Sequence, residues 1–214
     1  MPRDSGPTRR SLVDAAELLF VEKGLDVPLG EITKAAGQRN TGAVHYHFGG
    51  RDGLLRAILD RHVPVIAARR ADLLAEAGRT PGDPVGYARA LVLPITELLY
   101  GSPADRAYLQ ISVRLIADPT SAVAPYLGGD DVLAVVDAAI AALHPPTPDA
   151  YRERAFLAVQ MVGLLCAQRA ARGDVSPRPD AIVRTGELTR AEYEAHLTAI
   201  LTGALVPLAP PEGS

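Results

Sequence analysis

Apolar residues recur at helical spacing along nearly the whole chain, and this feature restricts the possible folds more than any other. Between residues 8 and 24, for example, Leu12, Ala16, Leu19 and Phe20 share one face of a helix. We find no sustained alternation of apolar and polar residues and no hairpin dipeptide between apolar runs, so strand signals are absent. No repeat of fixed period is visible. The pattern therefore predicts an all-α protein.

Capping residues and prolines divide this pattern into separate helices. Asp83, Ser102 and Thr147 each stand directly before a proline, which suits the first position of a helix. Thr189 begins a capping box that is completed by Glu192. The expected helices span residues 8–24, 30–36, 40–47, 51 to about 77, 84–100, 103–117, 130–143, 149–172 and 189–205.

Composition excludes several classes of protein. No apolar run approaches the roughly 20 residues of a membrane-spanning helix, and residues 1–10 lack the apolar core of a signal peptide, so we expect no membrane partner. The single cysteine, Cys166, excludes an internal disulfide and a cysteine zinc site. This fits a reducing cytoplasm, and the apolar neighbours of Cys166 predict an inert core thiol.

No metal site, cofactor or enzymatic activity is expected either. His45 and His47 are two residues apart, so they point to nearly opposite sides of a helix and cannot share one metal ion. Asp130 and Asp131 are better explained as favourable charges in the first turn of a helix than as metal ligands. We recognise no catalytic constellation.

Charge is unevenly distributed along the chain. Residues 1–70 carry eleven Lys and Arg against eight Asp and Glu, whereas residues 71–214 carry eleven against seventeen. A modestly basic N-terminal third on an acidic body permits contact with nucleic acid at one end. The difference is small, so charge alone is weak evidence for nucleic-acid binding.

Residues 30–48 hold two short helices joined by a turn that contains Gly37. This arrangement, with many hydrogen-bond donors at the start of the second helix, is typical of a helix-turn-helix that enters the major groove of DNA. Only the leading end of such a helix lies close to the bases, so its residues can reach base edges or phosphates. Asn40 is expected to cap this helix, and Arg51 to clamp the DNA backbone. The predicted DNA contacts are Gln38, Arg39, Asn40, Thr41, Gly42, Ala43, His45, Tyr46 and Arg51.

Four stretches in this order resemble the tetracycline-repressor (TetR) family of bacterial regulators. They are Thr8-Arg9-Arg10, Glu31-Ile-Thr-Lys-Ala-Ala-Gly37, Gly42-Ala-Val-His-Tyr-His-Phe48 and Gly49-Gly-Arg-Asp-Gly-Leu-Leu55. The resemblance covers about residues 8–66, with a turn one residue longer than the family's commonest form and His45 where tyrosine is usual. It implies a three-helix DNA-binding head, followed by a helical body that binds a small molecule and dimerises.

These expectations give a domain plan. Residues 1–7 form a tail, 8–66 the DNA-binding domain with the helix-turn-helix at about 31–50, 67–206 the ligand-binding and dimerisation domain, and 207–214 a second tail. Helices 149–172 and 189–205 are hypothesised to pair with their symmetry mates in a homodimer, as the family does. The two recognition helices would then be about 34–36 Å apart, or a multiple, matching a palindromic operator. A monomer whose last two helices complete one core is the alternative.

The expected small-molecule pocket lies among helices 84–100, 103–117 and 149–172. Gln110, Arg114 and Gln160 are its weak candidate contacts, and a mostly apolar cavity suits a hydrophobic or amphiphilic effector. Pro64 is expected to kink or end the helix that starts near Arg51. We hypothesise that ligand binding shifts this helix and changes the spacing of the heads, which couples ligand and DNA binding.

The sequence therefore predicts a ligand-responsive transcriptional regulator that binds double-stranded DNA as a repressor and is released by its ligand. Two other functions stay open. One is an all-α small-molecule-binding protein or enzyme with a vestigial N-terminal docking module, although no catalytic constellation supports it. The other is an architectural DNA-binding protein, for which the large apolar body has no evident use.

Overall fold

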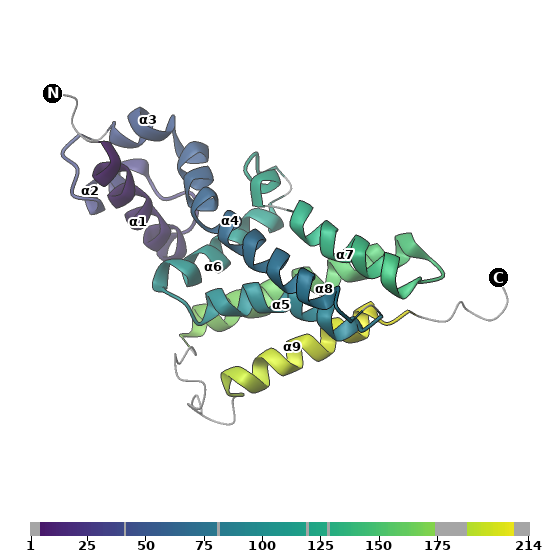
Figure 1. Ribbon diagram of the computed structural model, residues 1–214. Coiled ribbons are helices and arrows are strands. Elements are labelled where there is room, and N and C mark those ends of the chain that lie inside the picture. The colour runs from purple at the N-terminus through teal and green to yellow at the C-terminus, as the bar shows by residue number, and fades with distance from the viewer. Residues whose placement is uncertain are drawn as a thin grey trace. The chain divides into compact units, whose positions relative to one another are not determined.

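The computed structural model describes residues 5–40, 42–80, 82–118, 120–127, 129–173 and 188–207, and these are helical without any strand (Figure 1). The predicted all-α class is confirmed. Thr41 and most of the expected C-terminal tail, residues 208–214, lie outside the described residues. The helices are α1 (Ser5–Lys23), α2 (Leu29–Ala35), α3 (Ala43–Phe48), α4 (Arg51–Ala77), α5 (Pro84–Leu99), α6 (Pro103–Ala117), the 3₁₀ helix η1 (Ala124–Leu127), α7 (Asp130–Leu143), α8 (Pro148–Arg172) and α9 (Arg190–Leu205).

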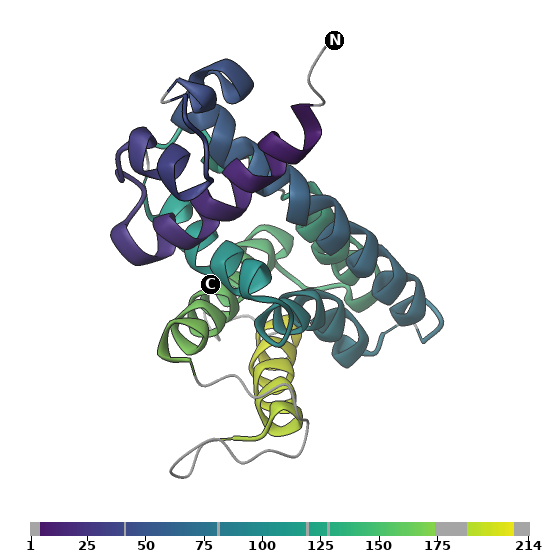
Figure 2. The ribbon, with the colours of Figure 1, turned by 90° about the vertical axis from the view of Figure 1, so that its left-hand side faces the viewer.

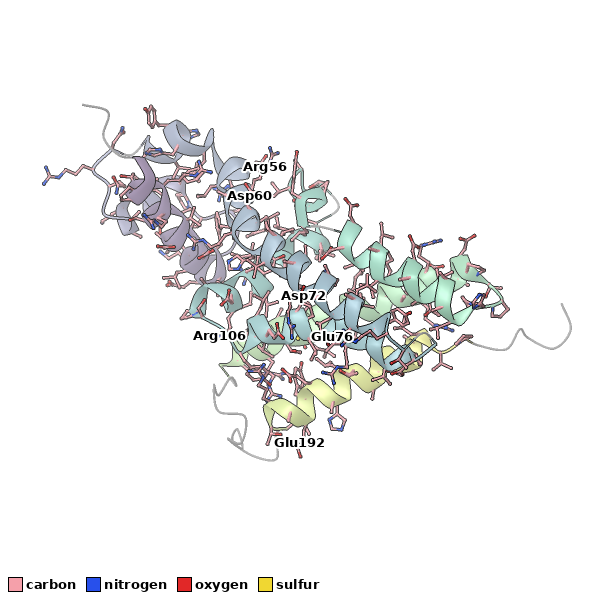
Figure 3. All side chains as sticks on the ribbon, viewed as in Figure 1. Arg56, Asp60, Asp72, Glu76, Arg106 and Glu192 are labelled. Carbon is pink, nitrogen blue, oxygen red and sulfur yellow. The ribbon has the colours of Figure 1, made fainter. Side chains whose placement is uncertain are left out.

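Side chains cap three helices where the sequence predicted it. Asp83 accepts a hydrogen bond from the first turn of α5 at 3.0 Å. Ser102 and Asp105 form a reciprocal capping box at the start of α6. Thr189 and Glu192, the latter labelled in Figure 3, form a second box at the start of α9. These local signals place the helix boundaries within one residue.

Some local expectations differ from the structure, and one short element was not expected. Thr147 is the N-cap of α8, but its side chain makes no capping hydrogen bond. Pro64 does not end α4, which continues as one helix to Ala77. The 3₁₀ helix η1 was missed, because four residues are too few to show a helical period.

The chain divides into two compact units. The head unit comprises Met1–Pro64 and Gly101–Leu127, and the body unit comprises Val65–Tyr100 and Gly128–Ser214. Helix α4 contributes to both units, and the division falls directly after Pro64. The plan of residues 8–66 and 67–206 did not foresee that α6 groups with the N-terminal helices.

In the head unit, α1 packs against α2 and α6, and α2 contacts α3 (Figure 1). The apolar face that helical spacing predicted for α1 is the side that is buried, with Leu12, Ala16 and Phe20 fully inaccessible. These side chains meet the apolar faces of the other helices, so burial of apolar surface stabilises the head. The large apolar side chains of α2, α3 and α4 that are also fully buried are Ile32, Val44, Leu54, Ile58 and Leu59.

A buried polar cluster explains why α6 belongs to the head. Glu17 of α1 is 1% exposed and accepts a hydrogen bond from Arg61 of α4 at 2.9 Å. His62 lies between two carboxylates: its Nε2 is 3.2 Å from Glu17, and its Nδ1 is 3.3 Å from Asp105 of α6. Its ring also stacks on Tyr108, with 4.7 Å between centroids. The cluster therefore ties α6 to both α1 and α4.

In the body unit, α5 packs against α7, α8 and α9, and α8 also packs against α9 (Figure 2). Cys166 of α8 is fully buried, and this burial raises the pKa of its thiol to about 12. A thiol that is both inaccessible and protonated at neutral pH is inert, as its apolar neighbours predicted. None of the described helices combines the length and apolar character needed to cross a membrane.

Candidate nucleic-acid interface

The turn after α2 is closed by a glycine in the left-handed region. Gly37 has a φ of +69°, and its N–H donates to the carbonyl of Lys34 at 3.0 Å. The next N–H, that of Gln38, donates to Thr33 at 3.0 Å, so two backbone bonds end α2. The Gln38 side chain donates to the carbonyl of Ala36 at 3.2 Å, which directs part of its amide toward the turn.

The Asn40 side chain stabilises a turn before α3 and does not cap the helix. Its Oδ1 accepts a hydrogen bond from the N–H of Gly42 at 3.0 Å, two residues further on. The predicted start of this helix at residue 40 was therefore three residues early, since α3 begins at Ala43 with Gly42 as its N-cap. Asparagine side chains bond the backbone two residues on in this way, and such a turn competes with helix formation.

Some of the predicted DNA contacts are exposed side chains, and others are buried or bonded to the protein itself. Arg39, Asn40, His45 and Tyr46 are exposed, and Tyr46 is 82% exposed despite its large aromatic ring. Arg39 makes no hydrogen bond or ion pair with any residue that the structure describes. An exposed tyrosine and an unpaired arginine beside a helix start are available to bind a partner. By contrast, Ala43 is 6% exposed and packs in the core.

Arg51 does not point its charge to solvent. Its guanidinium donates to the carbonyls of Leu25, Asp26 and Val27, with Nη2 at 3.3 Å from Asp26 and 2.8 Å from Val27. These carbonyls lie in the connection between α1 and α2. Because a single guanidinium serves three of them, Arg51 positions the helix-turn-helix, and its clamp on the DNA backbone stays a prediction.

Helix α3 is held in place at its C-terminal end by α1 and α4. Arg9 of α1 donates to the carbonyl of His47 at 3.0 Å, and its guanidinium lies 4.5 Å from the centre of the Phe48 ring. On the other side, a Cβ atom at Gly53 of α4 would lie 1.7 Å from the Phe48 carbonyl oxygen. Only glycine permits this approach. The positioning role of Arg9 has no local signal, because its partner is 38 residues away, whereas Gly53 lies in one of the stretches that resemble the TetR family.

The three candidate ligand contacts belong to different units. Gln110 and Arg114 are on α6 in the head unit, whereas Gln160 is exposed on α8 in the body unit. Gln110 donates to the carbonyl of Arg106 at 3.4 Å. Arg114 donates to the carbonyls of Phe20 and Val21 at the end of α1. Their role in ligand binding stays a prediction. In the described parts of the chain, no group of three His, Cys, Asp or Glu side chains could hold a metal ion.

Comparisons with known proteins give a family match, a curated relative and a solved structure. Residues 12–58, from α1 into α4, match the sequence profile of "bacterial regulatory proteins, tetR family". The HTH-type transcriptional regulator AcrR of Shigella flexneri is 28% identical over 110 residues, which are 51% of this chain and 49% of AcrR. The chain thus matches about half the length of this curated relative. A crystal structure of a protein from Rhodococcus sp. RHA1 has 20% identity over 94% of this chain and 100% of that chain, with a TM-score of 0.48.

Proposed function

Since residues 12–58 make the chain a member of the TetR family of bacterial regulators, we propose that it represses transcription by binding a palindromic DNA operator as a homodimer. Binding of a small-molecule effector then causes the homodimer to dissociate from the operator. The observation that carries the proposal is the exposed set Arg39, Asn40, His45 and Tyr46 around a short helix whose far end is held by α1 and α4. Rigid presentation of exposed donors is what base readout requires.

Each exposed residue has a proposed role. Arg39 and Asn40 precede α3, where side chains reach base edges in the major groove. Tyr46 and His45, further along α3, donate to phosphate oxygens and fix the register of the protein on the duplex. Thr41 remains a proposed contact beside them. Gln38, Gly42, Ala43 and Arg51 shape and support the turn.

Replacing Arg39 by alanine tests base readout without disturbing the fold, because Arg39 has no partner among the described residues. We expect operator affinity to fall by about 1–3 kcal/mol and affinity for random DNA to change little. Fluorescence anisotropy on both duplexes measures the two effects. Arg79→Ala removes the same charge from an exposed position in the body unit and should leave both affinities unchanged. Equal losses on operator and random DNA in Arg39→Ala would assign Arg39 to the phosphates instead.

An uncovered apolar stripe on the body unit supports the homodimer. Leu157, Met161 and Leu164 of α8 are 61%, 38% and 42% exposed, at spacings of four and three residues. Ile200 of α9 is 44% exposed. Apolar side chains at this spacing form one helix face, and such exposed faces mark interaction surfaces. We assign this surface on α8 and α9 to the symmetric contact between two copies.

A charge on this surface is expected to separate the dimer. Leu164→Glu would bury two like carboxylates near a symmetric interface, so the variant should have the mass of a single chain. Light scattering after size exclusion measures this mass. Leu18→Glu, at a position on α1 that is 59% exposed, is the matched control and should leave the dimer intact. A wild-type protein that already has the mass of one chain would contradict the proposed dimer.

Release by an effector is proposed to act through α4, because this helix contributes to both units. Ligand bound in the body changes the preferred geometry of α4 at Pro64, and with it the spacing of the two heads on the operator. The coupling is reciprocal: a ligand that weakens DNA binding must itself bind less tightly to the DNA complex.

A further inference from the structure

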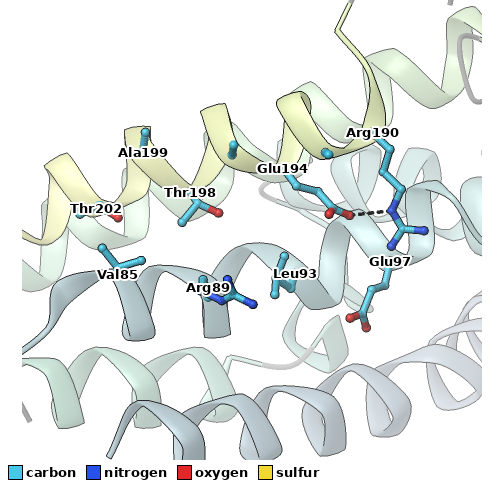
Figure 4. Close-up of a pocket in the computed structure, with 11 residues that line it drawn as sticks. Val85, Arg89, Leu93, Glu97, Arg190, Glu194, Thr198, Ala199 and Thr202 are labelled. Carbon is cyan, nitrogen blue, oxygen red and sulfur yellow. Dashed lines mark hydrogen bonds and ion pairs between the residues drawn. The ribbon is translucent and has the colours of Figure 1, made fainter. Parts of the chain in front are cut away.

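A groove of about 660 Å³ runs between α5 and α9 in the body unit (Figure 4). The two helices are antiparallel, since Val85 lies opposite Thr202 at one end and Glu97 opposite Arg190 at the other. From Val85 to Glu97 the groove follows α5 for about 18 Å, at 1.5 Å per residue. This volume and length suit a small organic molecule.

The groove exists because α9 presents small side chains to it. Ala191, Ala195 and Ala199 follow one another at four-residue spacing along the lining. Facing them on α5 is Leu93, which gives the middle of the groove an apolar wall. Any larger side chain at the central alanine would fill the space between the helices.

The charges at one end of the groove are already paired. Glu97 accepts two hydrogen bonds from Arg69 Nε and one from Nη2, at 2.9–3.1 Å. Arg190 donates to Glu194 at 2.9 Å, and its guanidinium lies 4.8 Å from the centre of the Tyr100 ring. The pairing leaves no net charge at this end for a ligand to neutralise.

Arg89, in the middle of the groove, differs from these residues. It is exposed, lines the cavity, and has no hydrogen bond, ion pair or ring contact with any described residue. Its positive charge therefore lies beside an apolar wall without a compensating anion. A carboxylate fits a guanidinium through two parallel hydrogen bonds, and a hydrocarbon chain fits the wall formed by Leu93 and Ala195.

We propose that the α5–α9 groove binds an amphiphilic monocarboxylate, whose head pairs with Arg89 and whose hydrocarbon chain lies along Leu93, Ala195 and Ala199. The predicted contacts Gln110, Arg114 and Gln160 are not among the residues that line this groove. That this ligand is the effector rests on the proposed function, whereas its binding to the groove does not.

Octanoate is the probe, and isothermal titration calorimetry of the full chain is the measurement. We expect saturable binding of octanoate and weaker binding of octan-1-ol, which has the same chain length and no charge. Arg89→Gln should weaken octanoate binding roughly tenfold, because a charge-assisted hydrogen bond is lost. Ala195→Leu should abolish binding by filling the groove, while Arg79→Gln, which removes an exposed charge elsewhere in the body unit, should have no effect.

Absence of octanoate binding to the wild-type chain, or unchanged binding in Arg89→Gln, would overturn the site. Because Arg89 is exposed and unpaired, this variant stays informative even if Ala195→Leu fails to fold, which circular dichroism would reveal. If Ala195→Leu changes the oligomeric mass instead, the groove is a contact between copies. DNA binding is measured separately: a protein that binds operator but not octanoate loses only the groove proposal. One that binds octanoate without DNA loses only the regulatory role.

Discussion

Gly53→Ala will abolish operator binding and destabilise the head unit. A Cβ atom at this position would lie 1.7 Å from the Phe48 carbonyl oxygen and 2.8 Å from its carbonyl carbon. Backbone atoms cannot rotate away as the end of a side chain can, so α3 and α4 must separate. We expect a loss of about 3 kcal/mol or more in the free energy of unfolding, measured by urea denaturation.

Gly30→Ala is the matched control for this variant. Gly30 lies in α2 of the same head unit, and a Cβ atom there would meet nothing within 4 Å. Alanine suits a helix better than glycine, so the control should be neutral or more stable by about 0.5–1 kcal/mol. If both alanine variants unfold at the same urea concentration as the wild type, the close approach between Gly53 and the Phe48 carbonyl does not hold α3 in position.

Asp131→Asn will strongly destabilise the body unit. Arg70 of α4 is 3% exposed, and its guanidinium bonds Asp131 of α7 and the carbonyl of Ala90. The substitution removes the compensating charge but leaves the buried guanidinium. Breaking one partner of a buried pair costs about 3 kcal/mol or more, which thermal or urea unfolding would detect.

Asp137→Asn is the corresponding change at the surface of the same helix. Asp137 pairs with Arg152 at 2.8 Å, but the two side chains are 56% and 38% exposed. Water replaces this interaction well, so the expected loss is much smaller than that of Asp131→Asn. Similar losses in both asparagine variants would show that burial does not set the strength of the Arg70–Asp131 pair.

Much of the fold was predictable because its signals are local. The start of α9 follows from Thr189 and Glu192, which are three residues apart and bond each other. The buried face of α1 follows from the helical spacing of Leu12, Ala16 and Phe20. In these cases, the residues that carry the signal also make the interaction.

The parts that sequence reasoning missed depend on contacts between distant segments. Arg114 bonds a carbonyl 94 residues away, so its spacing from Gln110 could not reveal that it serves the end of α1. Arg51 resembles a phosphate contact by position, yet its partners lie 24–26 residues earlier in the chain. For an arginine, the local sequence gives the charge but not the partner, and the partner determines whether it binds DNA or supports the site.

Selection of binding sites from a randomised pool of DNA duplexes, followed by anisotropy on the selected duplex, tests the central claim most directly. The proposed function predicts enrichment of an inverted repeat that binds two chains per duplex. It also predicts affinity far above that for random DNA across a salt series. Because the pool contains every short sequence, an operator that is distant from the gene would still be found. Recovery of no preferred sequence, with equally weak and salt-sensitive binding to every duplex, would contradict the assignment of residues 30–48 as a DNA-reading helix-turn-helix.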